Sequence, residues 1–181
     1  MLDLSPERAT DSVAVESLLD VAFGPDRHAK RSYAFREGIA PVADLCWLMR
    51  DGSRIVGAIR YWPVRAGGYP ALLLGPLAVA PDRRGEGIGK ALVDATLERA
   101  AAAGHGLVLL VGEPVYYARF GFEPAAPLGL VMPGEHPERL MVRLLDPAAV
   151  PTAPGPEGLV VERWRTAGEA GTAAYRAGDV A

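Results

Sequence analysis

A glycine-rich turn is the part of the sequence best suited to bind a ligand. The turn reads Arg-Gly-Glu-Gly-Ile-Gly-Lys from Arg84 to Lys90 and leads into a segment with helical spacing of apolar residues. The first amides of a helix have no partner within it, and they carry the positive end of the helix dipole. Glycines let an anion approach such amides closely. The turn therefore predicts a phosphate or diphosphate site.

Motif spacing excludes two common phosphate-binding turns. A P-loop would need glycine at Arg84, five residues before Gly89, and serine or threonine at Ala91. A dinucleotide-binding turn would need a third glycine at Lys90 or Leu92, depending on where it begins. The anion site is therefore of another type.

Strand and helix patterns surround this turn. Tyr69 to Ala80 is apolar but contains Gly75-Pro76, so it predicts a buried strand with an irregularity. Ile88 to Ala103 predicts a helix that ends at Gly104. The apolar segment Leu107 to Val111 should lie parallel to the Tyr69 strand, because a crossover helix joins the two. The turn thus lies within a βαβ unit.

The turn resembles the signature of the GNAT acetyltransferases. That signature is Gln or Arg, two residues, Gly, one residue, then Gly or Ala, and Arg84, Gly87 and Gly89 match it. The resemblance implies that the turn holds the diphosphate of acetyl-CoA, the acyl donor and co-substrate. The residues so assigned are Arg84, Gly85, Glu86, Gly87, Ile88, Gly89 and Lys90. The competing interpretation is a tight turn whose glycines serve geometry and whose arginines are solvated.

The same resemblance extends to the preceding strand and to the fold. In the family this strand is bulged and separates from the next parallel strand to admit the pantetheine arm, and Leu74 to Val79 is similar to it. By resemblance, Leu77, Ala78 and Val79 contact the acyl-CoA. The implied fold is the α/β (α+β) GNAT fold: a mixed, mostly antiparallel sheet with a splayed parallel pair and helices on both faces. Alternatively, Gly75-Pro76 only bends a core strand.

A tyrosine before a Gly-Phe pair is the candidate catalytic residue. Tyr116 to Phe122 resembles a late segment of the same family, with a tyrosine four residues before the glycine, and Tyr117 holds that position before Gly121. Attack of an amine on a thioester releases a thiolate, which a phenol can protonate. Tyr117 is therefore the candidate general acid. Tyr116 should pack elsewhere, because neighbouring helical residues point about 100° apart.

The base and the acceptor are less well defined. Glu113 and Glu86 are the two candidate bases, and a water chain would serve equally well. In the family, acceptor specificity comes from two segments, here Phe23 to Gly38 and Ala125 to Glu138. In the first of these, three residues could meet a polar acceptor or form a solvated helix face: Arg31, Arg36 and Glu37.

The remaining elements follow from apolar periodicity and turn residues. Asp11 to Phe23 and Arg27 to Glu37 predict two helices that precede the sheet. Antiparallel strands are predicted at Leu45 to Arg50 and Arg54 to Val64, joined by a turn at Asp51-Gly52. The later elements are a short helix from Pro114 to Arg119, a sheet strand from Arg139 to Leu145, and an added edge strand from Leu159 to Trp164.

Length and composition predict one globular domain in a reducing, cytoplasmic setting. Half of the 181 residues are apolar and the formal charge is −3, which leaves no basic footprint for nucleic acid or anionic lipid. The first residues lack the apolar run of a secretory signal, and no segment is apolar for long enough to span a membrane. The histidines and Cys46 show no metal-ligand spacing. The domain is predicted at residues 1–146, followed by a Pro-rich linker and tail at 147–181.

The resemblance to the GNAT family implies an N-acetyltransferase that transfers an acetyl group from acetyl-CoA to a primary amine of an unidentified acceptor by direct attack. One alternative is a non-catalytic acyl-CoA-binding domain that acts as a sensor or regulator. A third interpretation is nucleotide binding without CoA. Acyl length and oligomeric state stay open, a homodimer included.

Overall fold

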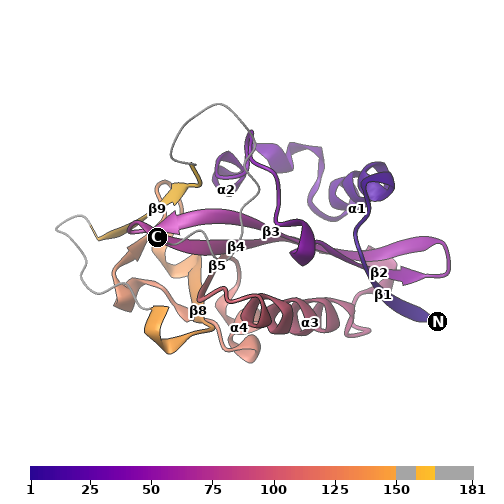
Figure 1. Cartoon of the computed structure of the whole chain (residues 1–181). Coiled ribbons are helices and arrows are strands. Elements are labelled where there is room, and N and C mark those ends of the chain that lie inside the picture. Colours follow the sequence, from indigo (N-terminus) through magenta and orange to yellow (C-terminus); the bar gives the residue numbers. More distant parts are fainter. Residues whose placement is uncertain (150–157, 166–181) are drawn as a thin grey trace.

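The structure is a computed structural model that describes residues 1–149 and 158–165, and in them a mixed sheet lies between two layers of helices (Figure 1). The helices α1 (Ser12–Phe23) and α2 (Arg31–Ala34) cover one face. The other face carries α3 (Ile88–Ala102) and α4 (Pro114–Tyr117). Helices on both faces were predicted, and this is confirmed.

The main path of the sheet has the strand order β1-β2-β3-β4-β5-β8-β6. All neighbouring strands in it are antiparallel except β4 and β5, which are parallel. The strands are β1 (Leu2–Pro6), β2 (Trp47–Asp51), β3 (Arg54–Ala66), β4 (Tyr69–Val79), β5 (Leu107–Val111), β6 (Glu123–Pro124) and β8 (Leu140–Leu144). The predicted βαβ unit is therefore β4-α3-β5.

Two predictions for the first forty residues are wrong. Strand β1 precedes α1 and pairs with β2, whereas two helices were expected before the sheet. The strand escapes a pattern search because Leu4 is its one residue that packs against the core. The helix expected from Arg27 to Glu37 is instead a 3-10 turn at Pro25–Ala29 followed by the four-residue α2. Lys30 between them has extended backbone (φ −67°, ψ 136°), which interrupts any continuous helix.

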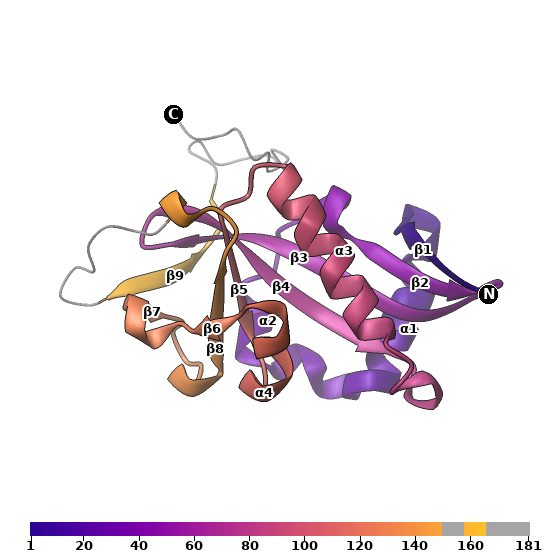
Figure 2. The same ribbon diagram turned by 90° about the horizontal axis from the view of Figure 1, so that it is seen from below.

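Strand β4 separates from β5 after two residue pairs. Parallel pairing holds only at Leu72↔Val108 and Leu73↔Leu109, and beyond them the two strands diverge (Figure 2). The β3–β4 register shifts at the same level, and Gly75 there has φ +125°, a backbone conformation that favours glycine. The predicted irregularity in this strand and the splayed parallel pair are both confirmed.

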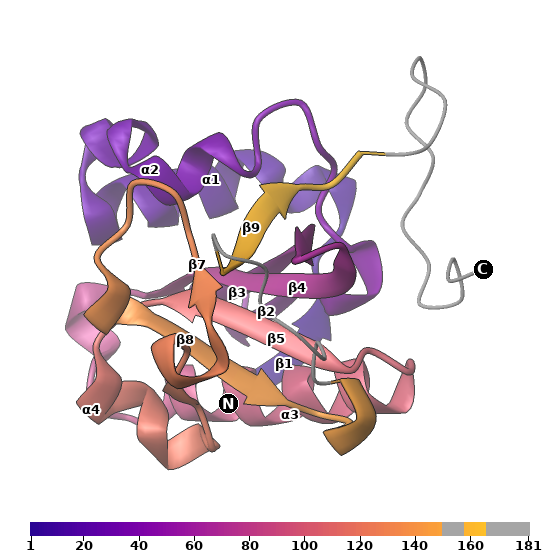
Figure 3. The ribbon, with the colours of Figure 1, turned by 90° about the vertical axis from the view of Figure 1, so that its left-hand side faces the viewer.

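The strand β9 (Leu159–Arg163) pairs with the end of β3 and with β7 (Leu130–Val131), as Figure 3 shows. Its Leu159 and Val161 are buried in the apolar cluster around β5 and β8. The predicted added strand is therefore present. The boundary proposed at residue 146 stays a prediction, and residues 150–157 and 166–181 of the predicted linker and tail lie outside the described residues.

Arg60 of β3 joins the first strand and the first helix to the sheet. Its guanidinium donates to both carboxylate oxygens of Glu7 at 2.8 and 2.6 Å, and to Glu16 of α1 at 2.7 Å. The side chains of Arg60 and Glu7 are each 11% exposed. Removing one partner of such a buried pair leaves the other charge uncompensated.

We expect Arg60→Ala to lower the free energy of unfolding by about 3 kcal/mol, because Glu7 would remain buried without a cation. Urea unfolding followed by circular dichroism measures the effect. Arg54→Ala is the matched control: it lies on the same strand and binds Asp82 through two hydrogen bonds, but both side chains are 56% exposed. Its loss should change stability far less. Equal losses in the two variants would contradict the prediction.

Candidate active site

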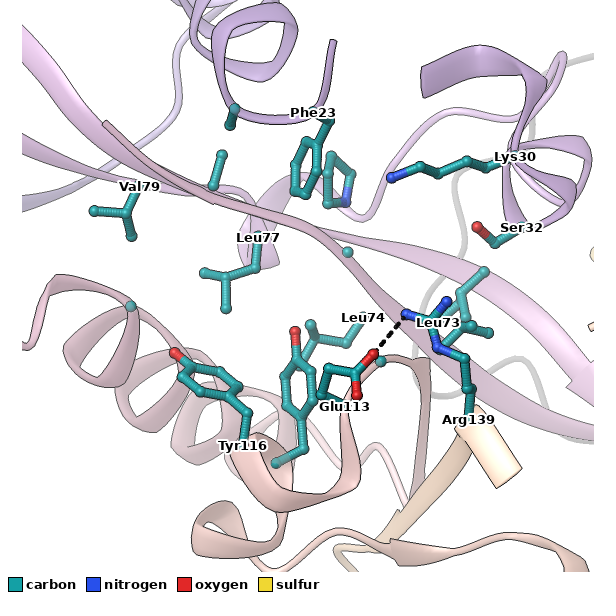
Figure 4. Close-up of a pocket in the computed structure, with 18 of the residues that line it drawn as sticks. Phe23, Lys30, Ser32, Leu73, Leu74, Leu77, Val79, Glu113, Tyr116 and Arg139 are labelled. Atoms are coloured by element: carbon teal, nitrogen blue, oxygen red, sulfur yellow. Dashed lines mark ion pairs between the residues drawn. The ribbon is translucent and has the colours of Figure 1, made fainter. Parts of the chain in front are cut away.

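A cleft of about 1170 Å³ opens where β4 and β5 diverge, beside the start of α3. It is lined by β4, the glycine-rich turn, α4 and the segment around α2 (Figure 4). The structure brings ten of the eleven predicted site residues to its wall: Leu77, Ala78, Val79, Arg84, Gly85, Gly87, Ile88, Gly89, Lys90 and Tyr117. Residues from distant parts of the sequence thus meet in one cavity.

Glu86 is the predicted contact residue that does not line the cleft. Its exposed carboxylate accepts two hydrogen bonds from Arg83, at 2.8 and 2.9 Å, and these hold the pKa of Glu86 below its usual value. Arg83 also donates to Asp51 at 2.7 Å. The side chain of Glu86 therefore fastens the turn to the β2–β3 hairpin, and it is not available as a general base.

The turn presents a row of free main-chain donors. Within the described residues, none of the seven amides from Arg84 to Lys90 donates a hydrogen bond to another protein group. The first helical bond of α3 runs from the Ala91 amide to the Gly87 carbonyl at 2.9 Å, and no side chain caps the helix. These amides and the helix dipole make the turn an anion-binding surface.

Glycine is needed at Gly87 and Gly89 for different reasons. Gly87 has φ +78°, a left-handed conformation, and a Cβ atom there would meet nothing within 4 Å, so open space lies beside the amides. Gly89 is buried, and a Cβ atom there would come within 2.8 Å of the Tyr116 hydroxyl. The first glycine shapes the turn, and the second lets a tyrosine approach α3.

The cleft is strongly positive although the chain is acidic. Eight basic and only two acidic side chains line it. The basic ones are Lys30, Arg31, Arg36, Arg83, Arg84, Lys90, Arg119 and Arg139, and the acidic ones are Glu113 and Glu135. Arg84 forms no ion pair with the described residues, so its guanidinium is available to an anion. A ligand with several negative charges would be attracted here.

The wall formed by β4 has an open strand edge. Leu77, Ala78 and Val79 pair with Ile59, Ala58 and Gly57 of β3 on one side. On the other side, β4 beyond Leu73 has no strand partner in the described part of the chain. An extended ligand with amide groups can pair with such an edge as an added strand does.

Both tyrosines of α4 reach the cleft, which corrects the expectation that only one would do so. Their rings pack edge to face with centroids 4.9 Å apart. The directions differ as expected, but the cleft is wide enough for Tyr116 to reach Gly89 while Tyr117 packs closely on Gly112. Burial raises the pKa of both phenols, that of Tyr117 to about 12. Both hydroxyls are therefore protonated at neutral pH.

Glu113 also faces the cleft. It occupies the N-cap position of α4 without capping it through its side chain, and it forms an ion pair with Arg139 at 3.4 Å (Figure 4). Its side chain is 75% exposed. Of the two candidate bases, only Glu113 has access to the cavity.

Several cleft residues escaped the sequence analysis. Lys30 and Glu135 lie in the two segments named for acceptor specificity, and Arg119 lies in the Tyr116 to Phe122 segment. No local pattern singles out these side chains or Arg139, so only the tertiary structure places them at the site. Lys30 and Ser32 lie on the other side of β4 from Tyr116 and Glu113 (Figure 4). The cleft thus has two sides, of which the signature residues mark only one.

Other reactive residues of the described chain lie apart from this chemistry. Cys46 is buried as expected: its thiol donates to the Val42 carbonyl at 3.3 Å, and burial raises its pKa to about 12. Among the described residues, no group of three or more potential ligands could hold a metal ion. In the same part of the chain, no helix is both long and apolar enough to cross a bilayer.

The split sheet, the anion-binding turn and the cleft between them define a mixed α/β domain that can hold an extended, anionic ligand. Residues 43–124 match the acetyltransferase (GNAT) domain family. YhbS of Escherichia coli (strain K12), described as an uncharacterized N-acetyltransferase, is 32% identical over 118 residues, which cover 64% of this chain and 70% of that protein. The chain therefore belongs to the GNAT N-acetyltransferase family, as the resemblance implied.

Solved structures agree with this assignment. The crystal structure of E. coli YhbS in complex with CoA superposes with a TM-score of 0.76 and 27% identity, covering 90% of this chain and 89% of that one. A GNAT family acetyltransferase from Brucella melitensis, solved with acetyl-CoA, has a TM-score of 0.65 at 24% identity and covers 91% of this chain and 96% of that one. The predicted GNAT fold is confirmed.

The environment of Tyr117 predicts its titration. The unfolded-state phenol loses its proton near pH 10 and the folded one near pH 12. The free energy of unfolding should therefore fall as the pH rises through this interval, because the unfolded state releases the proton first. Tyr117→Phe should weaken that fall. In folded protein, the tyrosinate absorbance of wild type and variant should coincide up to about pH 11. If the absorbance increase near pH 10 were smaller in Tyr117→Phe than in wild type, Tyr117 would be solvated and the prediction would be wrong.

Proposed function

We propose that this chain transfers an acetyl group from acetyl-CoA to a primary amine, and that the amine nitrogen attacks the thioester directly. The row of seven free amides from Arg84 to Lys90 carries the proposal, because it opens into a positive cleft beside an exposed strand edge. The CoA bound in the E. coli YhbS structure supports this choice of donor.

The residues of the turn fit the diphosphate of CoA. The amides from Arg84 to Lys90 would donate to its oxygens, and the open space at Gly85 and Gly87 leaves room for them. The Arg84 guanidinium would add charge. The pantetheine amides would pair with the free edge at Leu77, Ala78 and Val79. The acyl end of the donor would then point along β4 toward Gly75.

The transfer forms one bond and breaks another. A neutral amine nitrogen bonds to the thioester carbonyl carbon, the carbon–sulfur bond breaks, and the sulfur leaves with the electron pair. The amine gives up one proton and the sulfur gains one, so the products are an amide and a thiol. Two proton transfers therefore need groups in the cleft.

Tyr117 is the group that we assign to the leaving sulfur. With a pKa of about 12, its phenol stays protonated at neutral pH and donates a hydrogen bond as charge builds on the sulfur. A free thiol has a pKa of about 8.5, so transfer of the phenolic proton alone would be uphill. The phenol must therefore regain a proton as it gives one to the sulfur, and the proton that the amine releases can supply this. Tyr117 serves best as a relay between nitrogen and sulfur.

The acceptor must reach the carbonyl as a free amine. Glu113 opens onto the same cavity and could take up a proton directly or through water. It is highly exposed and pairs with Arg139, so water can reach its carboxylate. We therefore propose that water in the cleft takes the proton from the ammonium group of the acceptor and passes it to Glu113.

The donor site is tested with Gly87→Ala. The added methyl group would stand in the space beside the amides and strain a residue with φ +78°, so the Kd for acetyl-CoA in calorimetry should rise about tenfold. Gly52→Ala is the matched control, because Gly52 also has positive φ and open space around it but lies in the β2–β3 hairpin. It should bind acetyl-CoA as wild type does. Stabilisation of the wild type by ATP and not by acetyl-CoA would overturn the donor assignment.

The role of Tyr117 is tested with Tyr117→Phe in an assay of free CoA thiol over a panel of amines. We expect kcat to fall about a hundredfold with the Kd for acetyl-CoA unchanged, because only the hydroxyl is lost. Tyr116→Phe is the internal control and should retain most activity. If Tyr116→Phe lost kcat and Tyr117→Phe kept it, Tyr116 would be the residue that protonates the sulfur. Tight acetyl-CoA binding without turnover on any amine would favour a non-catalytic acyl-CoA sensor.

A further inference from the structure

A second pocket of about 710 Å³ adjoins the cleft on the side of α1 and α2. The two cavities share six residues: Ala29, Lys30, Arg31, Tyr33, Arg36 and Pro76. The pocket is therefore a lateral extension of the cleft that starts at the irregularity in β4. If the cleft holds acetyl-CoA, as proposed above, this extension is where a small acceptor would lie.

Arg36 stands at the junction of the two cavities. Its guanidinium carbon lies 4.4 Å from the centroid of the Tyr33 ring, which holds the side chain in place. A Cβ atom on Gly75 would come within 3.2 Å of Nη2, so the guanidinium reaches the point where β4 leaves its regular register. Arg36 thus lies close to the predicted acyl end of the donor.

Two of the three guanidinium nitrogens of Arg36 lack a hydrogen-bond partner among the described residues. Its Nε and Nη1 are buried, and neither has a hydrogen-bond partner in the described part of the chain. Burial lowers its pKa to about 10, so it still carries its charge at neutral pH. Glu135 is close enough to act on this charge, but it accepts the Ser32 amide at 2.9 Å and forms no ion pair with Arg36. The guanidinium of Arg36, with two buried nitrogens, therefore has no ion-pair partner among the described residues.

The other buried arginines of this pocket are fully paired, which makes the contrast with Arg36 informative. Arg60 binds Glu7 and Glu16, and Arg27 binds Asp20 and Glu16. The carboxylates on the α1 side are thus already engaged. Trp62 lines the same pocket, and its buried indole N–H also has no acceptor among the described residues. The buried pocket groups without a hydrogen-bond partner, those of Arg36 and Trp62, are both donors.

A buried, uncompensated charge is costly to the free protein, so its retention points to a ligand that completes it. The planar guanidinium matches a carboxylate through two parallel hydrogen bonds. We propose that the acceptor is a small amine that carries a carboxylate, that Arg36 binds this carboxylate, and that this contact selects the substrate. The inference rests on the proposed function, and it goes beyond it by naming the acceptor class.

Matched pairs of amines test the proposal on the full chain. The pairs are 4-aminobutyrate with butylamine, several α-amino acids with their amides, and O-phosphoethanolamine with ethanolamine. We expect kcat/KM for each amine with a carboxylate to exceed that of its neutral counterpart by at least about 30-fold, mostly through a lower KM. A contact between two buried charges has an effect of this size. The phosphate pair separates a carboxylate site from a general anion site, and a phosphate preferred over every carboxylate would overturn the proposal.

Variants tie the preference to Arg36. In Arg36→Met the ratio of kcat/KM between matched amines should fall below about threefold, because the carboxylate loses its cation. Arg36→Lys should recover only part of the preference, because a lysine lacks the planar fork. Arg99→Met, an exposed arginine over the Trp47 ring, is the control and should keep the full ratio.

Stability gives a readout independent of turnover. Removal of an uncompensated buried charge should raise the thermal midpoint of Arg36→Met above wild type by about 2–4 °C. A lowered midpoint would mean that Arg36 is structural, and it would overturn the inference.

Binding separates failure of this inference from failure of the proposed function. If neutral amines are acetylated as well as carboxylates, or if the preference survives in Arg36→Met, the function stands and the inference fails. If no amine is acetylated, the function fails. Calorimetry of 4-aminobutyrate with CoA present then decides the inference, because wild type should bind the carboxylate and Arg36→Met should not.

Discussion

The separation of β4 from β5 is the constraint on which the site depends. Two parallel strands that stayed paired would bury their main-chain groups against each other, and no ligand could enter between them. Here pairing stops after Leu73, and the edge beyond it faces a cavity. The shift of register opposite β3 turns β4 away, while the rest of the sheet holds both strands in place. A rigid sheet thus contains a permanent opening.

The two layers of helices give this opening two chemically different sides. The start of α3 contributes free amides and Arg84 on one side, where phosphate groups fit. The segment around α2 contributes the Arg36 guanidinium on the other, where a small acceptor fits. Irregular backbone between α1 and α2 brings Arg36 over Gly75, which a continuous helix would not necessarily do. The tyrosines of α4 lie where the donor and acceptor would meet.

The buried ion network pairs the two buried arginines that line the second pocket, Arg27 and Arg60. Arg60 and Arg27 bind Glu7, which directly follows β1, and Glu16 and Asp20 of α1. This network attaches the first strand and helix to the sheet and uses the carboxylates on the α1 side of the pocket. Arg27 and Arg60 thus stabilise the fold, whereas we propose that the neighbouring Arg36 binds the acceptor.

The sequence alone determined the side of the site that local chemistry defines. The glycines from Gly85 to Gly89 must lie at a helix start, because their spacing and the apolar period after them leave little choice, and Tyr117 follows from its distance to Gly121. Only the tertiary structure decided that β1 joins the sheet, that Tyr116 also reaches the cleft, and that the guanidinium of Arg36 lies beside Gly75 of β4 with two buried nitrogens. Periodicity and motifs report contacts between near neighbours in the chain. A strand partner, the width of a cavity or an unpaired charge depends on residues far apart in sequence, and no local pattern records it.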